Sequence, residues 1–431
     1  MPNTVSETYT PLDAFLPYQT PRLLAIVGSN PLPAHVAATL LASPGGTVTL
    51  ICTAASRDVA TKLIELLEKL GIACEPVLLV DEANRFEMFR LIQAKLGDVS
   101  DLVGLNYTGG TKSMSVHIYR AVEAWAVAKN APHPVFSYID PRRRAVVFDP
   151  KPGEIVSTSV PIPAVYPMHL CHLIEMHGWI QTQQQTEPIL VGVADALCAL
   201  YGTSVTAPQS WKTWKGTIFK PACWDRDKFI GNLDTNLPLP SGQEIAGVRK
   251  AIEAALSPLG RTPAVVDGQI VFRRVQACCG ITPKELCEFL DGKWLESSVL
   301  QALQRCQKSH HLKDLGMSLK AYLMNNSNIN FELDGVALHG YQLFAFSCGS
   351  GTYKGELKKK LFEVYSRAQQ IGGDEARIAL VSPYHAPNDL RDEISGDIGK
   401  QGHIRVFGWQ DLADLETKIS DWIGEEIKAI G

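Results

Sequence analysis

The sequence predicts an α/β protein in which a Rossmann-like domain at the N-terminus is followed by a second α/β domain at the C-terminus. Two observations predict this fold class. Between residues 22 and 149, short runs rich in Val, Ile and Leu alternate with longer segments whose apolar residues recur at helical spacing. Between residues 281 and 382, helical patterns alternate with a hairpin pattern and a further buried strand. Apolar strands separated by helices are typical of a mostly parallel sheet covered on both faces.

Composition indicates a globular chain of about two or three domains. The 431 residues are 45% hydrophobic and 20% charged, with a formal net charge of −4. No apolar run reaches the roughly 18 residues that a membrane helix needs, so we expect no membrane association. The near-neutral charge excludes a general nucleic-acid coat but leaves room for a local basic groove. Ten scattered cysteines without a C-x-x-C pair indicate free thiols in a reducing cytoplasm.

Six apolar runs and three helical stripes make up the expected first domain. The helix after the second strand is expected to begin at a cap on Ser56. The strand runs are residues 23–27, 47–53, 76–80, 101–108, 134–139 and 145–149. The apolar stripes are Val59, Leu63, Leu67 and Leu70; Phe86, Phe89, Ile92 and Leu96; and Met114, Ile118, Val122 and Trp125.

Three loops that follow the strands are the expected ligand-binding region, because parallel sheets bind ligands at the carboxyl ends of their strands. They read GSNPLP (28–33), TAAS (53–56) and NYTGGTK (106–112). In the last loop a Gly-Gly turn lets the backbone approach a ligand, and the helix that follows offers unpaired N–H groups to an anion. Thr108, Thr111 and Lys112 add hydroxyls and a positive charge, so the sequence predicts a phosphate-bearing ligand.

Two familiar nucleotide motifs are absent from these loops. The order of residues around Gly109 does not fit G-x-x-x-x-G-K-[ST], and the first strand turn lacks G-x-G-x-x-G. Neither an ATPase nor a dehydrogenase is therefore supported. The alternative for Gly109 and Gly110 is a tight strand-to-helix turn without a ligand.

Residues 156–280 give no clear fold. Tryptophans at 211, 214 and 224 are able to stack on bases, although packing is the more common role of tryptophan. Beyond this region the sequence predicts a capped helix at 282–291, a helix with a buried stripe, a hairpin and a long helix. With His339 and Gly340 as a two-residue turn, Asp334 would lie opposite Ala345 and Glu332 opposite Ser347, all on one face.

Glu296 on a helix and Asp334 on a strand are the kind of carboxylates that hold Mg²⁺ or Mn²⁺ beside a phosphodiester. Singly, such residues are usually solvated or structural. Together with the motifs NYTGGTKSM (106–114), FLDGKWLESSV (289–299), NFELDG (330–335) and FSCGSG (346–351), they give a resemblance to the CRISPR ancillary nucleases of type III systems. In that family a CRISPR-associated Rossmann (CARF) sensor is fused to a PD-(D/E)xK nuclease with a restriction-endonuclease-like fold.

The resemblance implies a CARF domain at residues 1–155, a middle region at 156–280 and a nuclease-like domain at 281–431. It further implies that the sensor forms a homodimer and binds a cyclic oligoadenylate, most often cyclic tetra-adenylate, across the two-fold axis. The matching ligand contacts are Asn106, Thr108, Gly109, Gly110, Thr111 and Lys112, with Ser29, Asn30, Thr53 and Ser56 in the neighbouring loops.

The nuclease motif departs from the family at one place. Relatives carry an acid and a lysine on the second hairpin strand, where this chain has Ser347, Cys348 and Gly349. The resemblance implies Glu296 and Asp334 as metal ligands with Glu332 in place of the missing acid. Lys354 or Lys358 is expected to supply the missing cation, although Lys358 to Lys360 also reads as a solvated helix face.

Two hypotheses follow from this resemblance. The first is a cyclic oligoadenylate-activated, metal-dependent endonuclease that cleaves DNA, RNA or both. The second is a sensor whose nuclease site has decayed and which binds or sequesters cyclic oligoadenylate, or acts as a nucleic-acid-binding scaffold. The presence of both Glu296 and Asp334 favours the nuclease.

Overall fold

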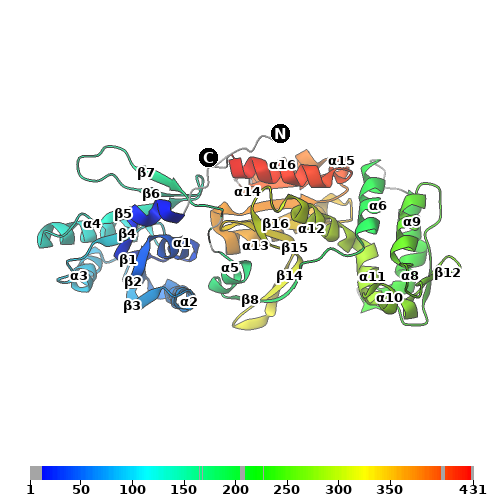
Figure 1. Cartoon of the computed structure of the whole chain (residues 1–431), viewed down its shortest axis with the longest axis horizontal. Coiled ribbons are helices and arrows are strands. Elements are labelled where there is room, and N and C mark those ends of the chain that lie inside the picture. The colour runs from blue at the N-terminus through cyan, green and yellow to red at the C-terminus, as the bar shows by residue number, and fades with distance from the viewer. Residues whose placement is uncertain are drawn as a thin grey trace.

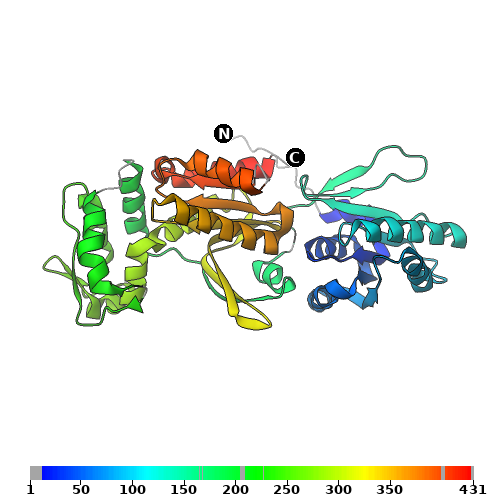
Figure 2. The ribbon, with the colours of Figure 1, turned by 180° about the vertical axis from the view of Figure 1, so that it is seen from behind.

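The computed structural model describes residues 12–164, 166, 168–203, 209–226, 228–398 and 403–428. These residues form three bodies along the long axis of the molecule (Figure 1). The N-terminal domain has a seven-stranded sheet, the C-terminal domain in the centre has a six-stranded sheet, and a mostly helical body lies at the far end. Figure 2 shows the same order from behind.

The sheet of the N-terminal domain has the strand order β3-β2-β1-β4-β5-β6-β7. The first five strands in this order, β3, β2, β1, β4 and β5, are parallel to one another. The last two, β6 and β7, are each antiparallel to the strand before them. The order reverses between β1 and β4, so the loops after these two strands flank the crevice where such sheets bind ligands. The strands are β1 (Thr20–Ile26), β2 (Ala42–Cys52), β3 (Ala73–Leu79), β4 (Val103–Asn106), β5 (Val135–Asp140), β6 (Ala145–Phe148) and β7 (Thr158–Pro161).

Helices cover both faces of this sheet, as the sequence predicts. Leu23 and Ala25 of β1 point into the core under α1 and α2, while Leu24 and Ile26 point into the core under α3 and α4. Burial on both faces explains why β1 is a continuous apolar run. The helices are η1 (Leu12–Tyr18), α1 (Leu32–Leu41), η2 (Ala54–Ser56), α2 (Arg57–Lys69), α3 (Arg85–Leu96) and α4 (Lys112–Lys129).

The sheet of the C-terminal domain has the order β18-β17-β16-β15-β14-β8. β16, β17 and β18 are parallel, and β15, β14 and β8 are antiparallel to their neighbours. The strands are β8 (Trp179–Gln185), β14 (Leu312–Leu323), β15 (Asn326–His339), β16 (Gln342–Cys348), β17 (Arg377–Val381) and β18 (Ile404–Phe407).

Helices α12 and α13 lie on opposite faces of this second sheet. Helix α12 crosses the front in Figure 1, and α13, in orange, crosses the front in Figure 2. The helices of the domain are α5 (Leu170–Met176), α11 (Pro283–Glu288), the π-helical segment η4 (Phe289–Lys293), α12 (Trp294–Cys306), α13 (Lys354–Gly372), η5 (Gly373–Glu375), α14 (Pro387–Ile398), α15 (Trp409–Leu412) and α16 (Leu415–Lys428).

The hairpin register differs from the expected one by two residues. His339 pairs with Gln342, so Gly340 and Tyr341 form the turn, with Gly340 at a φ of 59°. The residue that needs positive φ is therefore the first residue of the loop rather than the second. A shift of two residues preserves which side chains share a face, so Asp334 still projects from the same face as Ser347.

The middle region divides among all three bodies. β7 completes the first sheet, and β8 forms the edge of the second. The described residues between 191 and 279 form the helical body. Its elements are α6 (Val191–Gly202), α7 (Gln209–Trp214), the π-helical segment η3 (Lys215–Phe219), α8 (Lys220–Cys223), β9 (Trp224–Asp225), β10 (Lys228–Phe229), β11 (Asn236–Pro238), α9 (Ala246–Ala255), β12 (Val265–Val266), β13 (Gln269–Val271) and α10 (Phe272–Cys279).

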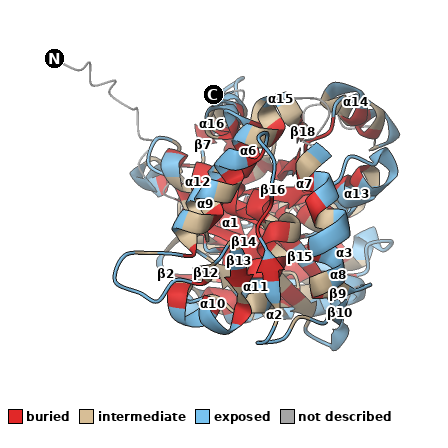
Figure 3. Ribbon diagram, turned by 90° about the vertical axis from the view of Figure 1, so that its right-hand side faces the viewer, coloured by how far each residue is buried: buried red, intermediate tan, exposed pale blue. Residues whose placement is uncertain are grey.

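One apolar core continues from the N-terminal domain into the C-terminal domain. Side chains under α1 and α2 belong to the same buried cluster as those under α13. Tyr166, fully buried at the junction, lies with its hydroxyl 2.7 Å from Nδ1 of His35 and packs edge-to-face on Tyr341 at 6.1 Å between ring centroids. Figure 3, a view along the long axis, shows the buried residues in red at the centre of the bodies.

Two further expectations concern cysteines and membranes. The ten cysteines are all free thiols, as the sequence predicts. Among the described residues, no helix combines the length and apolarity needed to span a bilayer.

Candidate active site and ligand-binding loops

The Gly-Gly loop between β4 and α4 packs directly against the end of β1. A Cβ atom at Gly109 would overlap the carbonyl oxygen of Ile26, and one at Gly28 would lie 2.9 Å from the amide nitrogen of Gly110. Gly110 also has a φ of 73°, which is strained for residues with a side chain. The glycines are therefore required for the two loops to meet.

Three of the expected ligand contacts use their side chains within the domain. Asn106 is buried, donates to the Ser137 hydroxyl at 3.2 Å and accepts from the Thr108 hydroxyl at 2.8 Å. The Thr108 oxygen in turn accepts from the amide of Ile139 at 2.8 Å. Ser56 is also buried and donates to the carbonyl of Val27 at 3.1 Å. These side chains shape the loops.

Thr53 lies beside Ser56, its backbone amide donating to the Ser56 hydroxyl at 3.2 Å. Ser56 is the N-cap residue of α2, as the sequence predicts, but its hydroxyl bonds to the first loop and to Thr53 and not to an amide of α2.

Asn30 lies at the junction with the C-terminal domain. Its Oδ1 accepts from the amide of Leu32 at 3.0 Å and lies 3.2 Å from Nε2 of His177, which follows α5. Its amide nitrogen approaches Gly373 at the end of α13. Asn30 therefore joins the first loop to two elements of the second sheet domain.

The exposed part of the loop cluster comprises Ser29, Gly110, Thr111 and Lys112. The Thr111 oxygen accepts from the amide of Met114 at 3.3 Å and caps α4, an 18-residue helix. The first amides of α4 point out of the helix, where they favour negative charge. The structure thus brings a helix N-terminus and a lysine to the crevice beside β1.

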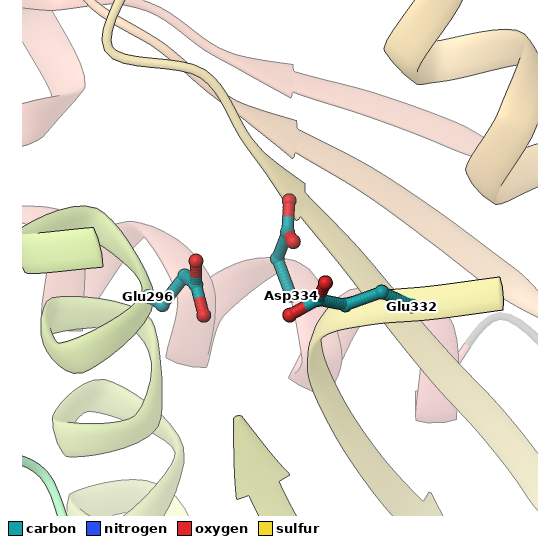
Figure 4. A group of neighbouring side chains, drawn as sticks. All are labelled: Glu296, Glu332 and Asp334. Carbon is teal, nitrogen blue, oxygen red and sulfur yellow. The ribbon is translucent and has the colours of Figure 1, made fainter. Parts of the chain in front are cut away.

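Three carboxylates meet over the second sheet. Glu296 comes from the first turn of α12, while Glu332 and Asp334, two residues apart on β15, share a face of the sheet. One oxygen from each carboxylate lies within 4.8 Å of the others. Figure 4 shows Glu296 pointing from its helix toward the two strand residues. The three residues expected at the metal site are therefore together.

Hydrogen bonds hold two of these carboxylates in place. Oδ2 of Asp334 accepts from the amide of Cys348 at 2.6 Å and from the hydroxyl of Ser347 at 3.0 Å. Oε2 of Glu296 accepts from the hydroxyl of Ser318 at 2.5 Å. Ser318 has a φ of 49° within β14, a strained conformation that is often found at functional sites.

Burial makes the site costly for negative charge. Glu296 is 7% exposed, and burial together with the nearby Asp334 carboxylate raises its pKa to about 8. Burial also raises the pKa of Glu332, which is more accessible. Clustered carboxylate oxygens with raised proton affinity match the hard oxygen ligands that Mg²⁺ and Mn²⁺ prefer.

Residues 283–425 match a protein family described as "Card1-like, endonuclease domain". The C-terminal domain is therefore similar to Card1-like endonuclease domains. The three carboxylates all lie within this matched range, so they belong to the endonuclease domain.

Two solved structures share the fold of nearly the whole chain. Can2 from Sulfobacillus thermosulfidooxidans, solved in complex with cyclic tetra-adenylate, is 15% identical with a TM-score of 0.65, and the match covers 96% of this chain and 99% of Can2. Protein VC1899 from Vibrio cholerae is 17% identical with a TM-score of 0.69, covering 95% and 98%. Among curated proteins, none has a significantly similar sequence. The expected fold class and the resemblance to CRISPR ancillary nucleases are confirmed.

Lys354 and Lys358 do not lie at the carboxylate cluster of the endonuclease domain. Both amino groups lie 2.6 Å from the carboxylate of Glu393 on α14, and Lys358 also lies 3.7 Å from Asp397. They point to α14 because they are four residues apart on the face of α13 that packs there.

Lys360 is the lysine of α13 that reaches the carboxylates. Its Nζ lies 3.7 Å from Oδ2 of Asp334. Gly349 makes room for it, since a Cβ at that position would lie 3.5 Å from Cδ of Lys360 and 2.8 Å from a methyl group of Leu357. The position where relatives carry the lysine is thus filled here by side chains from α13.

The carboxylates open into a cleft of about 880 Å³ between the endonuclease domain and the helical body. Lys320, 3.8 Å from Glu332, adds a second positive charge beside the cluster. Sequence reasoning missed Ser318, Lys320 and Lys360. The adjacency of Lys360 to Gly349 required the packing of α13, and no local pattern marks Ser318 or Lys320.

Proposed function

We propose that this protein is a metal-dependent endonuclease that cyclic oligoadenylate activates in type III CRISPR antiviral defence. The observation that carries the proposal is the cluster of Glu296, Glu332 and Asp334, with Lys360 beside it, in a matched endonuclease domain. A decayed site would have no chemical reason to bury Glu296 next to another carboxylate without compensation.

Glu296, Asp334 and Glu332 would hold a Mg²⁺ or Mn²⁺ ion, because they offer clustered carboxylate oxygens and bury one of them. When bound, such a cation polarises a phosphoryl oxygen and lowers the pKa of water. Asp334 is oriented for this by the Cys348 amide and the Ser347 hydroxyl. Serine at 347 thus orients an acid instead of supplying one.

Lys360 and Lys320 would stabilise the charge that develops on the phosphate during hydrolysis. Their amino groups stand beside Asp334 and Glu332 respectively, on two sides of the cluster. Preorganised positive charge at a reacting phosphate is among the larger contributions to catalysis. This assigns the missing motif lysine to Lys360 instead of Lys354 or Lys358.

The exposed loop cluster would bind the activator. The α4 N-terminus, Lys112, Thr111 and Ser29 offer donors and positive charge to phosphates at the crevice beside β1. A ring with several phosphates suits two copies of this loop cluster, so the proposal includes a homodimer with cyclic tetra-adenylate on its two-fold axis. The fold shared with the Can2 complex supports this activator.

The test is cleavage of supercoiled plasmid and of labelled single-stranded DNA and RNA. Each substrate is incubated with Mg²⁺ or Mn²⁺, with and without cyclic tetra-adenylate. Asp334→Asn serves as the inactive variant, and Glu363→Gln, which alters an exposed carboxylate elsewhere on α13, is the matched control. The proposal requires cleavage that depends on the metal, the ring and Asp334 but not on Glu363.

The competing hypothesis is a sensor that binds cyclic oligoadenylate without cutting. It predicts a thermal shift on adding the ring and no cleavage under any of these conditions. Failure of cyclic tri-, tetra- and hexa-adenylate to shift the melting temperature would remove the sensor assignment as well.

A further inference from the structure

A short segment of the helical body faces the carboxylates from across the cleft. This segment, formed by α7, η3 and α8, contributes Lys212, Lys215 and Lys220 to the cleft lining. It lies outside residues 283–425, which match the endonuclease family. The proposed hydrolysis of a phosphodiester does not by itself explain three lysines in this part of the cleft lining.

Lys215 anchors the segment to the helix that carries Glu296. Its Nζ lies 2.8 Å from Oδ1 of Asp291 and donates to the Asp291 carbonyl at 2.5 Å, and the side chain is only 15% exposed. Asp291 lies in η4, directly before α12. The carbonyl also accepts from the hydroxyl of Ser350 at 3.0 Å. Lys215 therefore fixes where the segment stands relative to Glu296.

Two π-helical segments meet at this contact. η3 begins with Lys215, and η4 contains Asp291. Such segments are rare and concentrate at functional sites, because the extra residue redirects side chains. Here they aim a lysine and an aspartate at each other across the base of the cleft.

The other two lysines leave positive charge exposed in the cleft. Lys220 shares Asp291 with Lys215, at 3.7 Å, and its side chain is 56% exposed. Asp291 therefore pairs with two lysines of the segment, while Lys212 has no ion-pair partner among the described residues. A phosphate backbone, with one charge per nucleotide, is the ligand that complements this lining.

We propose that Lys212 and Lys220 bind phosphates of the nucleic-acid strand that lies in the cleft, outside the bond that is cut, while Lys215 positions them. This inference rests on the proposed nuclease function and extends its substrate site to the helical body. Because the two lysines contact phosphates rather than the reacting atoms, they should govern substrate affinity and leave the chemical step nearly unchanged.

The salt dependence of binding tests the inference. The full-length Asp334→Asn protein, with cyclic tetra-adenylate and EDTA, is titrated against fluorescein-labelled single-stranded and duplex oligonucleotides at several KCl concentrations. The same measurement is made after adding Lys212→Gln and Lys220→Gln together. The matched control adds Lys250→Gln and Lys418→Gln, which alter two exposed lysines that do not line the cleft.

The variant with both Lys212→Gln and Lys220→Gln is called the cleft variant. For this variant we expect a smaller slope when the logarithm of the oligonucleotide association constant is plotted against the logarithm of the salt concentration. Removing one lysine–phosphate ion pair should lower the slope by about 0.7 for a single strand or about 0.9 for a duplex. In the background with Asp334 intact, the cleft variant should raise KM and keep kcat within about twofold. The control pair should match the parent, and equal melting temperatures show that the variants are folded.

Slope and KM unchanged in the folded cleft variant, with cleavage intact, would overturn the lysine assignment and leave the nuclease proposal standing. A reduced slope in a protein that never cleaves would support the nucleic-acid site and refute the nuclease. The absence of any nucleic-acid binding by the parent protein would overturn both.

Discussion

Glu296→Gln should stabilise the protein in the absence of divalent cations, and only at neutral to alkaline pH. The glutamate is 7% exposed and lies beside Asp334, so ionising it in the folded protein is unfavourable. Glutamine has nearly the same shape, can still accept from Ser318 and carries no charge. The substitution therefore removes the electrostatic cost and keeps the packing.

The sign follows from the two protonation equilibria. The pKa of Glu296 is about 8 in the folded protein against an ordinary value of 4.5. Below pH 4.5 the side chain is protonated in both the folded and unfolded states, and the cost is absent. Between pH 4.5 and 8 only the unfolded chain loses the proton, so wild-type stability falls as the pH rises and levels off above pH 8.

The size of the effect can be bounded. The pKa of Glu296 rises from 4.5 to about 8 on folding. At about 1.4 kcal/mol per pH unit, the ionisation of Glu296 lowers the free energy of unfolding of the wild type by at most roughly 5 kcal/mol at pH 8. Local hydration of the opened cleft reduces this, and we expect at least about 2 kcal/mol, or a rise of about 4 °C or more in the melting temperature of the endonuclease domain.

Differential scanning calorimetry in EDTA at pH 5 and pH 8 measures the effect. Glu296→Gln should melt higher than wild type at pH 8, and the gap should shrink strongly at pH 5. Glu363→Gln is the control, since it removes a charge from an exposed site. An equal gap at both pH values, or a lower melting temperature at pH 8, would refute the electrostatic reasoning.

Three other predictions concern the cation, the metal and the glycines. Lys360→Ala should slow single-turnover plasmid cleavage by about a hundredfold. Lys358→Ala should change the cleavage rate by less than threefold, because Lys358 contacts α14. Equal effects of the two substitutions would contradict the assignment of Lys360 as the catalytic cation. Adding 5 mM Mn²⁺ at pH 8 should raise the melting temperature of wild type by a few degrees and leave Asp334→Asn nearly unchanged, and equal shifts in both would place the metal elsewhere. Gly109→Ala should abolish the thermal shift on adding cyclic tetra-adenylate, because its Cβ overlaps the end of β1. Gly192→Ala, in an open helical position, should instead stabilise the protein by about 0.5–1 kcal/mol in urea unfolding.

The sequence was most informative where local periodicity and tertiary packing agree. All six expected strands of the first domain form, and the α4 stripe is buried. The α3 stripe was partly wrong: Ile92 and Leu96 are buried as expected, but Phe86 is 72% exposed, and Met88 faces the core instead. A run with apolar residues on several sides of a helix does not reveal which side the sheet will cover.

The carboxylates of the site were predictable, and the cations were not. Glu332 and Asp334 share a face because the strand period is two, whatever the hairpin register. Which of several adjacent lysines reaches Asp334 depends on the rotation of α13 against the sheet. That rotation is set by Leu357 and Leu361 in a core assembled from distant parts of the chain.

The hairpin error has a similar origin. Turn preference favoured His339 and Gly340, but the strands pair through His339 and Gln342, and Gly340 takes the positive φ at the first position of the loop. The middle region could not be divided because β7 is short, β8 is largely polar, and the partners of both strands lie in sheets outside the region.

Because Tyr166 shares one apolar core with His35 and Tyr341, we expect the N-terminal and C-terminal domains to unfold as one cooperative unit. A chain cut near residue 155 would leave aromatic and aliphatic surface open on both pieces, so each should aggregate or unfold when produced alone. If cyclic tetra-adenylate binds at the loop before α4, it should stabilise both domains together. The amide hydrogens of β15 and α13, which do not contact the ring, should then exchange more slowly when the ring is bound. Hydrogen exchange with and without cyclic tetra-adenylate would measure that transfer of stability directly.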